Sequence, residues 1–211
     1  MSGSPLERSR GRFVRNLVKV YHAASPAAHT LGRTWYLEAR RIVAEWSVTY
    51  ALPPATVACV IAALSPQCEW TRNLIIADDI LADRAVSVGG ALQANIRKAR
   101  AILAERPTSP NVMLVHFPGG PKVNSFAWNL LGDDGIVTVD THALQAAFND
   151  VRSTRTLKWA AYGVLARAYA TAALQVGEDN APFQAIVWHA WKERYPKGVK
   201  NHLRRKDRRH A

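Results

Sequence analysis

The stretch that decides the fold runs from Leu114 to Phe148 and reads LVHFPGGPKVNSFAWNLLGDDGIVTVDTHALQAAF. Its Pro-Gly-Gly-Pro segment at 118–121 cannot continue a helix, and the adjacent Gly119 and Gly120 allow a sharp turn of the backbone. A short helix opened by Lys122 is expected directly after this turn. Backbone N–H groups at the start of that helix would be free to bind a phosphate.

A second helix is expected after the tetrapeptide Val-Asp-Thr-His at 139–142. Asp140 stands directly before an apolar run with helical spacing, so it is predicted to cap this helix, a role worth about 1 kcal/mol. Lys122 and Asp140 therefore stand at the starts of two successive helices, 18 residues apart in the sequence.

Four landmarks in this order resemble the helix-hairpin-helix DNA glycosylase superfamily of the endonuclease III type. The lysine-bearing helix after the hairpin and the aspartate tetrapeptide have the family's spacing, and Leu64-Ser65-Pro66-Gln67 resembles the family's Leu-Ser-x-Gln. The segment 95–99, Asn-Ile-Arg-Lys-Ala, resembles the family's Asn-x-x-Lys-Ala helix. The resemblance covers roughly residues 55–150. The segment 117–122 departs from it, because it is one residue shorter than the family's Leu-Pro-Gly-x-Gly-x-Lys hairpin.

The resemblance implies a DNA glycosylase, with AP-lyase activity alongside, that flips a base out of the duplex. Lys122 would attack C1′ of the sugar, displace the base and form a Schiff base. This attack needs a neutral amine, although the ordinary pKa of a lysine is about 10.4. Asp140 would stabilise positive charge on the sugar or activate the nucleophile. The competing interpretations are a lysine that contacts a phosphate and an aspartate that is only a helix cap.

Further residues are candidates for DNA contact. Gln67 and Trp70 follow Leu-Ser-Pro, where an amide and an aromatic ring would fill the gap that an extruded base leaves. For Trp70 the alternative is a half-buried core position. Arg97 and Lys98, with Arg100 beside them, would contact phosphates or form a solvated helix face. His142 is placed at the start of its helix, because neither it nor His116 has metal-ligand spacing.

The composition favours a polyanionic partner, for which double-stranded DNA is the prediction. The chain has 28 Lys and Arg against 16 Asp and Glu, a formal charge of +12 and a pI near 10.2. A solvated basic surface without a specific partner is the alternative. Cys59 and Cys68 are too few to form a four-thiolate iron–sulfur cluster or a disulfide framework. No metal or organic cofactor is implied. A monovalent cation bound at the hairpin stays open as an alternative.

The predicted fold is all-α, because apolar residues recur with helical spacing and alternating strand patterns are missing. We expect one two-lobed glycosylase-like domain over 1–196, with a cleft between the lobes. Its core lobe would cover about 55–150, the second lobe would come from both chain ends, and 197–211 would be a basic flexible tail. The predicted helices span 13–21, 35–46, 54–64, 71–81, 92–103, 157–176 and 182–194, the last one capped by Asn180, while residues 1–11 are expected to be loose.

The chain has no apolar run of transmembrane length and no apolar signal core, so no membrane is expected. A monomer in the cytoplasm is predicted, associated with the nucleoid, or in the host cytoplasm if a phage encodes it. Two other functions stay open: a phage-type enzyme of the same fold that acts on hypermodified thymidine, and a helix-hairpin-helix protein that binds DNA without catalysis. The base that is recognised does not follow from the sequence, because the pocket residues would come from several helices.

Overall fold

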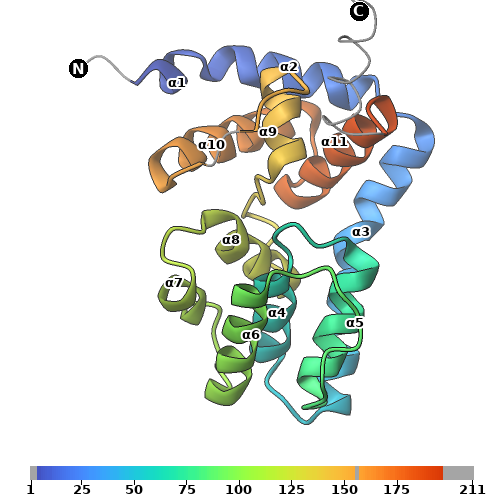
Figure 1. The fold of residues 1–211 in the computed structure, drawn as a ribbon. Helices are drawn as coiled ribbons and strands as arrows, with labels where there is room; N and C mark the ends of the chain where they lie inside the picture. The colour runs from blue at the N-terminus through green and yellow to red at the C-terminus, as the bar shows by residue number, and fades with distance from the viewer. Residues whose placement is uncertain (1–3, 155–156, 197–211) are drawn as a thin grey trace, which may run out of the picture. The chain divides into compact units, whose positions relative to one another are not determined.

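In this computed structural model the described residues are 4–154 and 157–196. They form eleven helices and no strand, so the all-α prediction is confirmed (Figure 1). The helices are α1 (Pro5–Arg8), α2 (Arg10–His22), α3 (Pro26–Thr49), α4 (Pro54–Leu64), α5 (Trp70–Leu81), α6 (Gln93–Glu105), α7 (Val112–His116), α8 (Pro121–Leu130), α9 (Thr141–Phe148), α10 (Trp159–Val176) and α11 (Asn180–Arg194).

The chain divides into two compact units. The terminal unit combines the residues up to Trp35 with those from Val137 onward, and the central unit runs from Tyr36 to Ile136. The sequence predicted a central lobe from about 55 to 150, but α9 belongs to the terminal unit because its buried residues pack in that unit's core. The predicted basic tail, 197–211, lies outside the described residues.

In the central unit α4 is the inner helix. Every residue from Ala55 to Leu64 is buried, and α5, α6 and α8 pack against it (Figure 1). Pro54 occupies the first helical position, where its missing N–H costs no helix hydrogen bond. This helix confirms the prediction of a largely buried segment opened by Pro53-Pro54.

In the terminal unit α2 packs against α9, α10 and α11 (Figure 1). Its inward side carries Phe13 and Leu17, which are fully buried, and Trp191 of α11 lies in the same apolar cluster. Two further buried aromatic residues, Tyr169 and Phe183, contact each other edge to face at 6.0 Å between ring centroids. Burial of several large side chains stabilises such a cluster by roughly 1.5–3 kcal/mol for each of them.

Two short helices and several helix starts differ from the sequence predictions, most of all α3, which begins at Pro26 rather than at 35. Residues 5–8 form α1 rather than a loose segment, because Oγ of Ser4 accepts a hydrogen bond from N of Glu7 at 3.2 Å. A Ser-x-x-Glu pattern with Pro at the first helical position was the signal for it. The lead-in to the hairpin contains α7, and α11 begins at Asn180, which was predicted to be its cap.

Gly32 of α3 is required for close packing against α11 within the terminal unit. A Cβ at this position would lie 2.5 Å from N and 2.6 Å from Cα of Ile186, and neither backbone atom can rotate away. We therefore expect Gly32→Ala to lower the free energy of unfolding by roughly 2 kcal/mol or more, despite alanine's better helix propensity. Urea or thermal unfolding measures this loss.

Gly11→Ala in α2 is the matched control, because a Cβ there would meet only Nη1 of Arg15 at 3.7 Å. It should leave the stability unchanged or raise it by up to about 1 kcal/mol. Equal effects of the two substitutions would contradict a close approach of α3 and α11 at Gly32.

Candidate functional site

Asp140 caps α9, as the sequence predicted. Its backbone is extended, with φ −92° and ψ −172°, and Oδ1 accepts a hydrogen bond from N of Ala143 at 2.8 Å. Asp140 is half-buried, which leaves its carboxylate partly open to solvent. The cap bond fixes the direction in which the carboxylate points.

A second donor, which the sequence did not reveal, holds the other carboxylate oxygen. Nε1 of Trp188, on α11, donates to Oδ2 of Asp140 at 2.9 Å. Nζ of Lys192 lies over the Trp188 ring, 4.1 Å from its centroid. The rings of His142 and Trp188 are in edge-to-face contact, with 5.9 Å between their centroids. No local pattern marks Trp188, because it follows Asp140 by 48 residues and is one of seven tryptophans.

Two buried tyrosines of α10 hold the segment around Asp140 from the core side. The hydroxyl of Tyr162 donates to O of Val137 and accepts from N of Val139, both at 2.9 Å. The hydroxyl of Tyr169 donates to O of Ala143 at 2.9 Å. Burial, and to a smaller extent the charge of Asp140, raises the pKa of Tyr169 well above its usual range. Tyr169 therefore stays a hydrogen-bond donor at any physiological pH.

The hairpin in the central unit turns without left-handed glycines. Its backbone closes through a hydrogen bond from N of Gly120 to O of Phe117 at 2.9 Å, and Nδ2 of Asn124 donates to the same oxygen at 3.2 Å. Neither Gly119 nor Gly120 has a positive φ. The reason for glycine at 120 is space, since a Cβ would lie 2.9 Å from Cγ2 of Val123. The turn predicted at these two glycines is therefore present, but it forms without a positive φ at either of them.

Lys122 stands in the first turn of α8 and is half-buried. Its Nζ lies 3.4 Å from Oγ and 3.5 Å from O of Ser65, which directly follows α4. One turn further along α8, Phe126 contacts Trp70 edge to face at 6.3 Å between ring centroids. The loop 65–70 thus lies along the side of α8 that carries Lys122.

The other predicted DNA contacts of the central unit have different environments. Gln67 is exposed and has φ +60°, a backbone conformation that costs a non-glycine residue roughly 1 kcal/mol. Trp70 is half-buried against Phe126, so its ring has a packing role. The strained backbone and exposed amide of Gln67 are typical of a residue in a binding loop.

The predicted residues on the basic face of α6 differ in exposure and in their contacts. Arg97 is exposed, whereas Nζ of Lys98 lies 4.1 Å from the ring centroid of Phe117, at the start of the hairpin. Nη2 of Arg100 donates to O of Arg84 at 2.7 Å, and Nη1 of Arg100 lies 3.6 Å from Oδ1 of Asp83. The contacts of Arg100 tie α6 to the loop after α5, so Arg97 and Lys98 remain the candidates for phosphate contact.

The candidate residues form two groups, one in each unit. The central unit brings Lys122, the loop around Gln67 and the hairpin together, while the terminal unit holds Asp140 with His142 and Trp188. Among the described residues no group of three or more His, Cys, Asp or Glu side chains could hold a metal ion. Within the same residues no helix is both long and apolar enough to cross a membrane.

The match to known protein families extends over both groups. A family model described as a family of unknown function (DUF7178) matches residues 4–195. The chain belongs to this family. No curated protein and no solved structure is significantly similar to it. The DUF7178 match therefore covers both groups of candidate residues but assigns no role to them.

Proposed function

We propose that this DUF7178 member is a DNA glycosylase with AP-lyase activity, and that Lys122 and Asp140 carry out its chemistry. The proposal rests on the resemblance of the hairpin, the lysine helix and the aspartate tetrapeptide to the helix-hairpin-helix glycosylases. The observation that supports it most is the carboxylate of Asp140, which two N–H donors from Ala143 and Trp188 hold in one orientation. Preorganised charge of this kind is what a cationic transition state requires.

The two carboxylate oxygens favour one of the roles considered for Asp140. Both already accept hydrogen bonds, so the group is better suited to stabilise positive charge on the sugar than to take a proton from the nucleophile. Nζ of Lys122 would form the new bond to C1′ as the glycosidic bond breaks. The base leaves with the bonding electron pair and takes up one proton. The C1′–O4′ bond then breaks, O4′ takes up the second proton that the amine loses, and the imine forms between Nζ and C1′.

The substrate would be double-stranded DNA. The protein would bind it as a monomer and mainly through the phosphates. The charge of +12, the exposed Arg97 and the position of Lys98 beside Phe117 support this partner. A cytoplasmic protein associated with DNA fits the same interpretation. The hairpin, one residue shorter than in the resembled family, favours a divergent member, so an enzyme of the same fold that acts on hypermodified thymidine is the second candidate.

A borohydride trap on a panel of duplexes tests the proposal. The wild-type protein is incubated with normal, uracil-containing, oxidised, abasic and hypermodified-thymidine duplexes, and borohydride then reduces any imine to a stable cross-link. We expect trapping on abasic DNA and on at least one modified or damaged base. Trapping confined to the hypermodified duplex would favour the second candidate. Binding without trapping or base release on any duplex would leave only a DNA-binding protein.

A further inference from the structure

The outward side of α2 carries a row of cations. Arg12, Arg15 and Lys19 are exposed and follow a spacing of three and four residues, which places them on one face, opposite the buried Phe13 and Leu17. In the described part of the chain none of these three cations forms an ion pair with a carboxylate. No acidic residue occurs between Arg8 and Leu37 in the sequence, so this row has no neutralising neighbour on its own segment.

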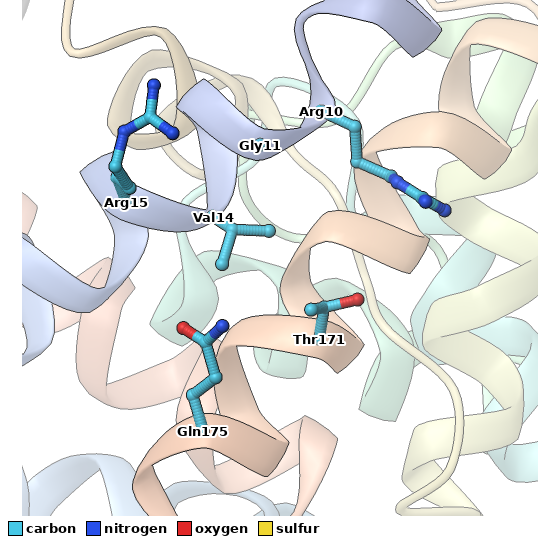
Figure 2. Close-up of a pocket in the computed structure, with 6 residues that line it drawn as sticks. All are labelled: Arg10, Gly11, Val14, Arg15, Thr171 and Gln175. Carbon is cyan, nitrogen blue, oxygen red and sulfur yellow. The ribbon is translucent and has the colours of Figure 1, made fainter.

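A groove lies beside this row, between α2 and α10. It has a volume of about 340 Å³ and is lined by Arg10, Gly11, Val14, Arg15, Thr171 and Gln175. Figure 2 shows the side chains of Val14, Thr171 and Gln175 directed into the space between the helices, with Arg10 and Arg15 on opposite sides of it. The Gln175 amide supplies N–H donors, Val14 supplies an apolar floor, and the Arg15 side chain lines the edge of the groove. This combination suits a phosphodiester with its attached sugar.

We propose that this basic row and groove form a second DNA-backbone site, separate from the hairpin in the central unit. Arg12 to Lys19 span about 10 Å along the helix axis, at ~1.5 Å per residue. Phosphates of one strand recur every ~3.4 Å along a duplex, so a row of about 10 Å lies beside roughly four of them, and each of the three cations can contact one. The site recognises no base, because arginine and lysine contacts to phosphate carry no sequence information.

An anionic membrane surface is a poorer match for the same cations. A helix that binds in a membrane interface buries its apolar face among the lipids. The apolar face of α2 is already used, because Phe13 and Leu17 are fully buried in the core of the terminal unit. The inference depends on the proposed function only in taking DNA as the partner, and it requires no chemistry at Lys122.

The test is a triple variant, Arg12→Gln with Arg15→Gln and Lys19→Gln. Binding to a fluorescent duplex without damage is measured by anisotropy over a salt series. Each lost phosphate contact should reduce the slope of log K against log salt by about 0.9, so a total reduction of roughly 2 to 3 is expected. The corresponding affinity at 0.1 M salt should fall roughly a hundredfold. The exposed positions should leave the thermal midpoint nearly unchanged.

A second triple variant with the same change in net charge is the control. Arg41, Arg106 and Arg152 are also exposed, and their replacement by glutamine should change the affinity by no more than about threefold. Equal weakening by both triple variants would overturn the inference, because net charge alone would then explain binding. If the wild-type protein binds no duplex, DNA is not the partner, and the proposed function fails with the inference. If it binds and traps DNA but the two triple variants behave alike, the inference alone fails.

Discussion

Replacing Lys122 with alanine should abolish the borohydride cross-link while most of the DNA affinity is kept. The imine requires the Nζ amine, and no other atom of the side chain can replace it. The substitution removes no core packing, since the amine lies against Ser65 and the side chain is only half-buried. A single phosphate contact among many would be lost, so the dissociation constant should rise by less than about tenfold. Gel electrophoresis of the reduced mixture and anisotropy give the two readouts.

Lys98→Ala is the matched control for this experiment. Lys98 is also half-buried in the central unit, and its Nζ lies over the ring of Phe117 at the hairpin. It should weaken DNA binding about as much as Lys122→Ala but still allow trapping. If Lys122→Ala retains the cross-link, another amine forms the imine, and the role assigned to Lys122 is wrong.

Local patterns were sufficient to predict the longer helices and the cap of α9, but not the short helices α1 and α7. Pro53-Pro54 followed by ten apolar or small residues predicts a buried helix, and Asp140 before an apolar run predicts a cap, because both depend on neighbours within a few residues. The donor that holds Asp140 from α11 could not be predicted in this way. Trp188 contacts the carboxylate because α11 packs against α9. A local sequence pattern does not show which of the tryptophans will lie beside Asp140.

The hairpin shows a second limit of sequence-based prediction. Two adjacent glycines indicate conformational freedom, but a missing side chain can equally provide space. At Gly120 it is the approach of Val123 that excludes a Cβ, and this approach exists only after α8 has folded against the turn. In the same way, the charge of Arg100 indicates a phosphate contact in the sequence, whereas the fold uses it to bind O of Arg84.

Asp140→Asn should slow base release by roughly a hundredfold or more, because it removes the negative charge that would stabilise the sugar cation. The structure adds a stability cost that the cap alone does not predict. Asparagine has one acceptor oxygen, whereas Asp140 accepts from both Ala143 and Trp188. If the amide oxygen keeps the cap, its NH₂ faces the Trp188 N–H, donor against donor. We expect a loss of about 1 kcal/mol and a thermal midpoint lower by roughly 2–4 °C.

Trp188→Phe separates the loss of charge from the loss of stability. Phenylalanine keeps an aromatic ring but has no N–H, so the clash of donors cannot arise. Asp140→Asn should therefore be nearly neutral for stability in the Trp188→Phe background, since asparagine caps a helix as well as aspartate does. Single-turnover base release should still fall roughly a hundredfold in that background. If the rate falls only where the stability falls, Asp140 acts as a helix cap, and its charge has no part in catalysis.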